Sequence, residues 1–162
     1  MSNYLNKNFV INFLIILSIF ALDRFSKIYV IFQNKKNLST ELFESKYLNI
    51  DLIWNEGIAF GFLSYENKNI YNFITLLIIL INILIIYILF ILNDFRKYFF
   101  LIILGGSLGN LFDRFVYKAV PDFIDFHIGD LHWFIFNPAD IFISVGVFCL
   151  ILVEFTSKDK KK

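Results

Sequence analysis

Cysteine, proline and charge are scarce in this chain of 162 residues. It has one cysteine, two prolines and seven glycines, and 18% of its residues are charged. The single cysteine, Cys149, excludes an intrachain disulfide, and its place in an apolar run predicts a small, buried and unreactive side chain. A net charge of +1 gives no basic field, and no stripe of basic and aromatic residues is present, which argues against nucleic acid as a partner.

Hydrophobic residues, in contrast, make up 58% of the chain and lie in long blocks. A helix needs about 20 apolar residues to cross a bilayer. The blocks therefore predict an all-α membrane protein, a four-helix transmembrane bundle in a single domain over residues 1–162, with spans at about 9–32, 70–92, 98–116 and 139–155. The first span lacks a small-x-small cleavage site and continues into DRFSKIYVIF, so we expect it to be retained and not removed as a signal peptide.

Lysine and arginine in the segments that flank the spans predict the orientation in the membrane. The densest cations lie on one side, which should be cytoplasmic: Lys7, Arg96, Lys97, Lys158, Lys160, Lys161 and Lys162. Both termini are therefore predicted in the cytoplasm, and the two long loops, residues 33–69 and 117–138, outside. In the first loop Leu48, Ile50 and Leu52 alternate with polar residues, which predicts a small hairpin-like sheet at the outer surface.

The polar residues of the spans share one predicted depth. Ionisable groups inside a membrane are costly and usually face a protein interior, so each is a candidate for function. The polar residues of the spans occur late in the first and third spans and at the start of the fourth, near the outer face: Asp23, Lys27, Asn110, Asp113, Arg114 and Asp140. In the third span, Asn110, Asp113 and Arg114 follow Gly106 at helical spacing and so share one face of the helix. We expect this face to look into the bundle, where the glycine permits a close approach of another backbone.

Neighbouring cations divide the acids into two groups. Lys27 follows Asp23 by one helical turn, and Arg114 is adjacent to Asp113. An opposite charge favours the ionised carboxylate, so we expect both of these acids in structural salt bridges.

Asp122 and Asp140 have no such cation beside them. Two carboxylates held together in a poorly solvated site share a proton, and one then serves as base and the other as acid, which is the chemistry of aspartic proteolysis. The spacing alone also allows a structural interpretation, in which Asp140 caps the fourth helix and Asp122 belongs to a turn. Both interpretations stay open at this point.

Five polar blocks occur in order along the chain: DRFSK, NEGIAFG, GGSLGNLFDR, VPDFIDF and FNPAD. With the chain length and the four spans, they resemble lipoprotein signal peptidase, the bacterial signal peptidase II that cleaves prolipoproteins in the inner membrane. The resemblance implies an aspartic peptidase with a dyad of Asp122 and Asp140 and no cofactor or metal. It also implies a small extracytoplasmic β-cradle from the loop around Asn55, and a short helical flap over the site.

The same resemblance implies the residues around the dyad and the substrate. Residues that bind the substrate or support the site would be Asn55, Gly57, Gly106, Asn110, Asp113, Arg114, Asn137, Ala139, Asp23 and Lys27. The substrate would be a prolipoprotein whose lipobox cysteine carries diacylglycerol, cut just before that cysteine by a monomeric enzyme among membrane lipids. Three residues depart from the common pattern, namely Arg24, Pro121 and the additional acid Asp125.

A metal site is the first rival. His127 and His132 lie five apart beside Asp125 and Asp130, whereas helical metallopeptidase sites use two histidines four apart with glutamate between them. We therefore expect no catalytic metal, and histidines in loop or interface roles.

Other chemistries fit the sequence less well. A serine or cysteine nucleophile lacks the Gly-x-Ser-x-Gly elbow, and Ser107 and Cys149 lie within predicted helices. An ion channel needs polar groups through the whole membrane, and the second span and the inner halves of the first and third spans have little beyond Asn12, Asn72 and Asn82. A channel and a membrane scaffold remain the rivals from other classes.

Overall fold

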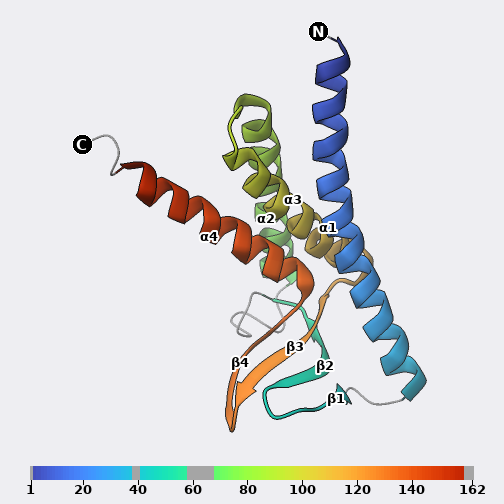
Figure 1. Ribbon diagram of the computed structural model, residues 1–162. Coiled ribbons are helices and arrows are strands. Elements are labelled where there is room, and N and C mark those ends of the chain that lie inside the picture. Colours follow the sequence, from blue (N-terminus) through green and yellow to red (C-terminus); the bar gives the residue numbers. More distant parts are fainter. Residues whose placement is uncertain (1, 38–40, 58–67, 159–162) are drawn as a thin grey trace.

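The computed structural model describes residues 2–37, 41–57 and 68–158. It has long helices with an antiparallel sheet at one end of them (Figure 1). All four helices are long and apolar enough to cross a membrane, which confirms the predicted multi-pass architecture; they are α1 (Ser2–Asn37), α2 (Lys68–Ile91), α3 (Arg96–Tyr117) and α4 (Pro138–Lys158).

The first helix differs from its prediction in length. The apolar run predicts a span over 9–32, but α1 covers 36 residues because the polar segments at both ends continue the helix. At 1.5 Å per residue it is about 54 Å long, well beyond the ~30 Å hydrocarbon layer. Its last turns therefore extend beside the sheet (Figure 1).

The sheet is larger than predicted because both long loops contribute to it. Its strand order is β1-β2-β3-β4, all antiparallel, with β1 (Glu41–Phe43), β2 (Leu48–Asn55), β3 (Val120–Ile128) and β4 (Leu131–Phe136). The expected alternation over 48–52 lies in β2. The second predicted loop, residues 117–138, contains β3 and β4. The short helical flap is not found among the described residues, and residues 58–67 lie outside them.

Helix ends and strand ends meet at one level, and this brings polar side chains together. Lys118, in the left-handed conformation with φ 60°, ends α3, and β3 begins two residues later at Val120. β4 ends at Phe136 and α4 begins at Pro138, with Asn137 between them. The residues around both transitions are therefore held from two directions, by the bundle and by the sheet.

Glycines on α3 let α1 and α4 approach its backbone. A Cβ atom at Gly106 would lie 2.6 Å from the carbonyl oxygen of Ala139 on α4, and one at Gly109 would lie 2.5 Å from Asp23 Oδ2 on α1. The close approach predicted at Gly106 is thus present, and its partner is the start of α4. Ala139 itself is fully buried.

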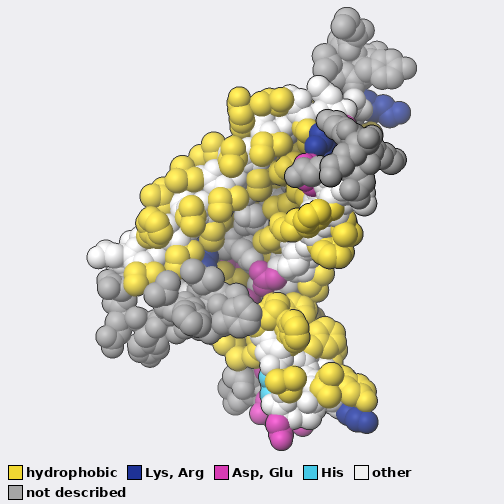
Figure 2. All heavy atoms as spheres, turned by 90° about the vertical axis from the view of Figure 1, so that its left-hand side faces the viewer, with side chains coloured by type: hydrophobic (Ala, Val, Ile, Leu, Met, Phe, Trp, Pro, Cys, Tyr) yellow, Lys and Arg dark blue, Asp and Glu magenta, His cyan; other side chains and the backbone are white. Residues whose placement is uncertain are grey.

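The outer faces of the helices are hydrophobic, as a lipid-facing surface requires (Figure 2). Phe90 on α2 is 82% exposed and Phe25 on α1 is 72% exposed. Large apolar side chains with this exposure, over a whole surface, are unfavourable in water and suit contact with lipid. Cys149 is a free thiol and is half-buried, whereas its apolar surroundings in the sequence predicted a buried side chain.

Candidate active site

Asp122 lies near the start of β3, is 5% exposed and is held by two asparagines. The side-chain amide of Asn55 on β2 donates to its Oδ2 at 2.9 Å, and that of Asn137 donates to its Oδ1 at 2.6 Å. The antiparallel pairing of Asn55 with Val120 and of Ile53 with Asp122 sets the first contact. Both carboxylate oxygens therefore have a fixed donor.

Asp140 is in the first turn of α4, where it forms a reciprocal cap with Asn137. The Asn137 side-chain oxygen accepts the Asp140 N–H at 3.2 Å, and Asp140 Oδ2 accepts the Asn137 N–H at 3.0 Å. Asn137 is thus the N-cap, Pro138 takes the first helical position, and Asp140 takes the third, as in a capping box. The cap expected at Asp140 belongs to Asn137, and Asp140 is its reciprocal partner.

Asn137 contacts both acids and so places their carboxylates on either side of one buried residue. Burial, and after it the negative charge of Asp140, raise the pKa of Asp122 from 3.8 to about 6, against the opposing effect of the hydrogen bonds from Asn137 and Asn55. Capping and participation in a carboxylate pair are therefore compatible roles for Asp140.

Charges next to this pair form a buried and balanced cluster. Lys27 Nζ, fully buried, lies 2.9 Å from Asp23 Oδ1 and 2.7 Å from Asp113 Oδ2. Arg24 pairs with the same two acids, at 2.8 Å from Asp23 Oδ2 and with both guanidinium Nη atoms on Asp113. Two cations and two acids thus neutralise each other where α1 meets α3.

This charge cluster reaches one of the catalytic candidates, Asp140, through Asn110. Lys27 Nζ donates to Asn110 Oδ1 at 2.8 Å, and Asn110 Nδ2 donates to Asp140 Oδ1 at 2.8 Å. Asp23 Oδ1 accepts the backbone N–H of Ala139 at 3.1 Å, which satisfies a free amide in the first turn of α4. The cluster therefore fixes both the start of α4 and one oxygen of Asp140.

The expected pairing of Asp113 with its neighbour Arg114 is wrong. Adjacent residues on a helix point about 100° apart, so Asp113 turns to α1 while Arg114 turns to the end of β2. Arg114 Nη2 donates to the Gly57 carbonyl at 2.7 Å, and Gly57 N–H donates to Asn55 Oδ1 at 2.9 Å. Arg114 therefore reaches the Asp122 side of the site through Gly57 and Asn55.

Arg114 is 6% exposed, and its Nε and Nη1 have no hydrogen-bond partner among the described residues. Its guanidinium carbon lies 5.2 Å from the ring centre of Tyr71 on α2, whose hydroxyl donates to the Arg114 carbonyl at 2.9 Å. The side chain is thus fixed from two sides and keeps N–H donors available.

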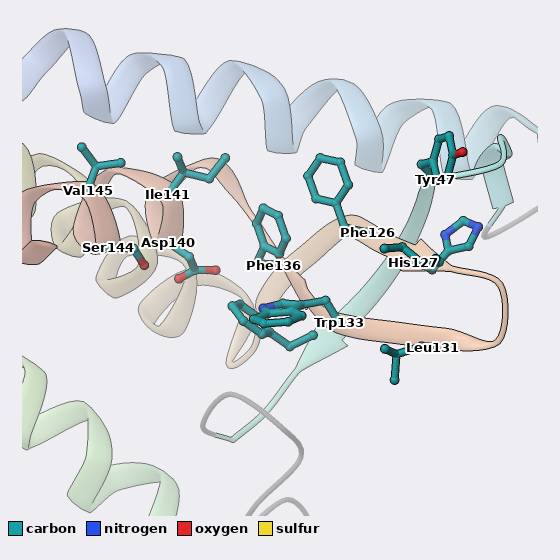
Figure 3. A pocket seen from close by; sticks show the side chains of 12 residues that line it. Tyr47, Phe126, His127, Leu131, Trp133, Phe136, Asp140, Ile141, Ser144 and Val145 are labelled. Atoms are coloured by element: carbon teal, nitrogen blue, oxygen red, sulfur yellow. The ribbon is translucent and has the colours of Figure 1, made fainter.

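A pocket of about 620 Å³ lies beside Asp140, between α4 and the β3–β4 hairpin (Figure 3). Its walls are mostly apolar and aromatic, with Asp140 at the helix end and Trp133 and Leu131 on the hairpin. A carboxylate at one end of an apolar pocket suits an elongated ligand that has a polar reacting group and a hydrophobic portion.

The remaining acids of the second loop lie elsewhere on the hairpin. Asp125 Oδ2 lies 2.8 Å from His132 Nδ1, and Asp130 is in the exposed turn between β3 and β4. The two histidines, expected in loop or interface roles, are paired strand residues, His127 on β3 opposite His132 on β4.

Comparisons with known proteins identify the family of the chain. A family profile described as Signal peptidase (SPase) II matches residues 15–156. The chain belongs to the signal peptidase II family. A lipoprotein signal peptidase of Pelagibacter ubique (strain HTCC1062) is 50% identical over 155 residues, covering 96% of this chain and 93% of the relative. One of Aquifex aeolicus (strain VF5) is 37% identical over 170 residues, covering 100% and 96%.

Solved structures support the same assignment. A bacterial membrane enzyme determined by the in meso method at 2.3 Å resolution has a TM-score of 0.80 and 30% identity, covering 93% of this chain and 91% of its own. A second, at 1.9 Å resolution, has a TM-score of 0.73 and 29% identity, covering 88% and 90%. The signal peptidase II family consists of proteases, so the channel and scaffold interpretations give way to a membrane protease.

Sequence reasoning missed two contributors to the site. Arg24 was noted as a departure from the common pattern, yet it contacts both acids of the cluster; a cation next to Asp23 in an apolar span was the available signal. Tyr71 sits at the start of an uncharged span, and nothing in the sequence pairs it with Arg114.

Proposed function

We propose that this signal peptidase II is an aspartic endopeptidase whose dyad is Asp122 and Asp140. The contact of Asn137 with both carboxylates is the observation that carries the proposal. Asp122 supplies the protonated member because burial and the charge of Asp140 raise its pKa to about 6. Asp140 is the base, and Asn110 and the capping bond hold its two oxygens in place.

The reaction follows from these positions. Asp140 takes a proton from water as the water oxygen attacks the scissile carbonyl carbon, and Asp122 gives its proton to the carbonyl oxygen. The tetrahedral intermediate collapses when Asp140 passes its proton to the leaving nitrogen, the C–N bond breaks, and Asp122 recovers a proton from a hydroxyl of the intermediate. Nε and Nη1 of Arg114, which have no hydrogen-bond partner within residues 2–37, 41–57 and 68–158, lie near the Asn55 side of the dyad and suit a substrate backbone carbonyl.

We propose as substrate a prolipoprotein whose lipobox cysteine carries diacylglycerol, cleaved before that cysteine. Relatives named lipoprotein signal peptidase support this class. The apolar pocket beside Asp140 suits a hydrophobic segment of such a substrate, and the exposed apolar residues Ile141 and Val145 line it on α4. A lipid-anchored peptide would reach the dyad from the bilayer without leaving it.

The test is cleavage of a diacylglyceryl-modified lipobox peptide by the purified chain in detergent. Asp122→Asn and Asp140→Asn should each lower kcat by at least ~100-fold with the protein still folded, because each removes one of the acid–base partners. Asp130→Asn, which changes an exposed acid of the same hairpin, should retain activity, and chelator should not abolish cleavage as the loss of either aspartate does.

Two results would change the proposal. Cleavage retained by Asp140→Asn would move the base to Asp113 or Asp125. Equal cleavage of a peptide without diacylglycerol would contradict the lipid-modified substrate while leaving the dyad in place.

We also propose that the chain is a monomer of the bacterial inner membrane with both termini in the cytoplasm and the site near the extracytoplasmic face. The start of α1, the connection between α2 and α3 and the end of α4, where the sequence has Lys7, Arg96, Lys97 and Lys158, lie on the side away from the sheet (Figure 1). In a Cys149→Ser background, an impermeant maleimide on intact spheroplasts should label Asp130→Cys and not Lys97→Cys. The reverse pattern would invert the topology.

A further inference from the structure

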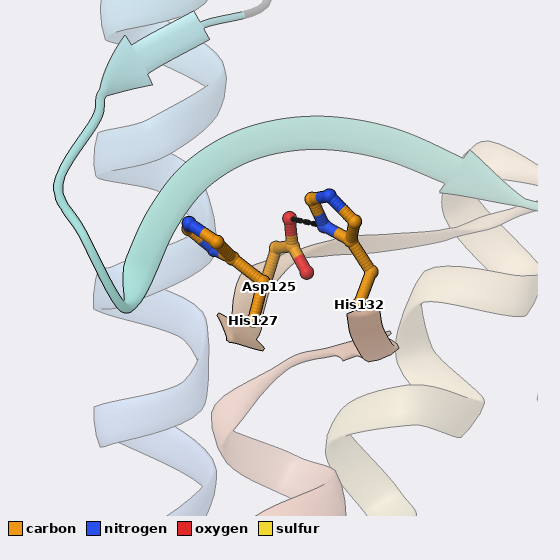
Figure 4. A group of neighbouring side chains, drawn as sticks. All are labelled: Asp125, His127 and His132. Atoms are coloured by element: carbon orange, nitrogen blue, oxygen red, sulfur yellow. Dashed lines mark hydrogen bonds and ion pairs between the residues drawn. The ribbon is translucent and has the colours of Figure 1, made fainter. Parts of the chain in front are cut away.

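A second polar cluster lies on the β3–β4 hairpin, apart from the dyad. It consists of Asp125 and His127 on β3 and His132 on β4, whose candidate ligand atoms all lie within 4.8 Å of one another. The carboxylate of Asp125 lies next to the imidazole ring of His132, with His127 close by (Figure 4). The whole sequence has two histidines, and the hairpin brings both of them together.

Strand pairing creates this arrangement. His127 is directly opposite His132 across the antiparallel pair, and their rings stack with centroids 5.0 Å apart at 21°. A register shift between Asp125 and His127 marks a bulge. Bulges re-aim side chains, and here Asp125 meets the imidazole of His132 at 2.8 Å although Ile135 is its partner across the strands.

The cluster has buried polar atoms whose bonding capacity is unused. Asp125 is 3% exposed; its Oδ2 contacts His132, but its Oδ1 has no hydrogen-bond partner among the described residues. The buried Nδ1 of His127 likewise has none there. Leaving a buried carboxylate oxygen and an imidazole nitrogen unpartnered costs free energy that a shared cation would recover.

We propose that Asp125, His127 and His132 bind one divalent transition-metal ion of the Zn²⁺ type. Two imidazoles and one carboxylate are a ligand set that Zn²⁺ favours, whereas Mg²⁺ and Ca²⁺ favour oxygen ligands. Metal–ligand bonds of about 2.0–2.2 Å put tetrahedral ligand atoms about 3.3–3.6 Å apart, so rotation of the imidazoles closes the cluster around the ion. The side chain of His132 is 52% exposed, which gives the ion a way in.

The surrounding charge favours a cation. Asp51 on β2 interacts electrostatically with both Asp125 and His132, and its Oδ1 is another buried oxygen without a partner among the described residues. Acidic side chains lie next to a histidine at this end of the sheet (Figure 2). Three protein ligands leave one coordination position for water.

The metal's role is to brace the hairpin. β4 is the edge strand and pairs only with β3 in the sheet order, and its exposed apolar residues Leu131 and Trp133 form one wall of the pocket. A metal bonded to both strands would hold that wall against the rest of the sheet. This site is separate from the proposed acid–base chemistry, and its test does not depend on catalysis.

Metal binding is measured on the tag-free full chain in detergent after treatment with chelator and buffer exchange. Calorimetric titration with Zn²⁺ should give one ion per chain, and saturating Zn²⁺ should raise the melting temperature by about 5 °C or more. Co²⁺ should produce visible absorption bands of a four- or five-coordinate site. Mg²⁺ and Ca²⁺ at the same concentration should do neither.

Variants assign the site. His132→Ala and Asp125→Asn should each weaken Zn²⁺ binding by at least ~100-fold and abolish the visible Co²⁺ bands, while Asp130→Asn, the exposed acid of the same turn, should bind as the unchanged chain does. Circular dichroism of each variant establishes folding. Zn²⁺ binding that persists in the His127→Ala, His132→Ala double variant, or no binding by the unchanged chain, would overturn the proposal.

Discussion

Replacing Asp122 by asparagine should stabilise the protein at neutral pH relative to the unchanged chain, and remove activity at the same time. The pKa of Asp122 in the folded protein is raised from 3.8 to about 6, chiefly by burial and then by the charge of Asp140. The native state therefore binds more protons than the unfolded state between these two values. Its stability must fall as the pH rises through this window, because the buried carboxyl group has to ionise.

The size of the effect follows from the shift. A change from 3.8 to about 6 corresponds to roughly 3 kcal/mol, present in full above the folded pKa and absent below 3.8. Asparagine carries no such penalty. It does place an amide against the donors of Asn55 and Asn137, which costs about 1–2 kcal/mol at any pH. The difference in stability between variant and parent should therefore change by about 2–3 kcal/mol from pH 4 to pH 8, in favour of the variant.

Thermal unfolding in detergent at pH 4 and pH 8 measures this difference. For a chain of this length, the melting temperature of Asp122→Asn minus that of the parent should rise by roughly 5–10 °C between the two values. Asp130→Asn, an exposed acid on the same hairpin, should show no comparable rise. A difference that does not change with pH would show that Asp122 is not a carboxyl group held protonated by its surroundings, and the assignment of the acid would fail.

Other predictions concern the pH profile and the buried cluster. The kcat/KM profile should fall on its alkaline side with an apparent pKa near 6, because the acid Asp122 loses its proton there; Asn55→Ala removes a hydrogen bond that lowers this pKa and should move the fall to higher pH. If the alkaline fall of kcat/KM stays at the same pH in Asn55→Ala, Asn55 does not influence the pKa of the catalytic acid. Gly109→Ala puts a methyl group where Asp23 Oδ2 lies, and the melting temperature should report a loss of about 1–3 kcal/mol, while a neutral result would mean that α1 moves freely. Lys27→Met leaves buried acids short of a partner and should cost about 3–5 kcal/mol; unchanged stability would contradict a buried ion pair.

The sequence predicted the helices well because a bilayer imposes a length on an apolar run. The run of uncharged residues in α2 could hardly form anything else, and its bounds differ from the prediction by one or two residues at each end. Polar groups late in α1 and α3 and early in α4 could be expected at one level for the same reason. Lys27 beside Asp23 followed from helical periodicity alone.

The partners of Asp113 and the second half of the sheet could not be predicted in this way. Sequence adjacency suggested Arg114 for Asp113, but adjacent helical residues diverge, and the real partners, Arg24 and Lys27, are 89 and 86 positions away. Residues 120–136 lacked a clean alternation of polar and apolar positions because Asp122 and Asp125 on β3 are both buried. Pairing with β2, set by the register at Asn55, forms the strand despite that pattern.

The arrangement of charge suggests why the site uses four acids when two suffice for hydrolysis. Asp23 and Asp113 are each bonded to Lys27 and Arg24, and they hold α1, α3 and the start of α4 together. Through Asn110 the same lysine reaches Asp140, but no cation contacts Asp122 among the described residues. Uncharged amides orient the proposed dyad without neutralising it, so its two carboxylates can still compete for a proton. A cation placed directly beside Asp122 would stabilise the fold and remove that competition, on which the chemistry depends.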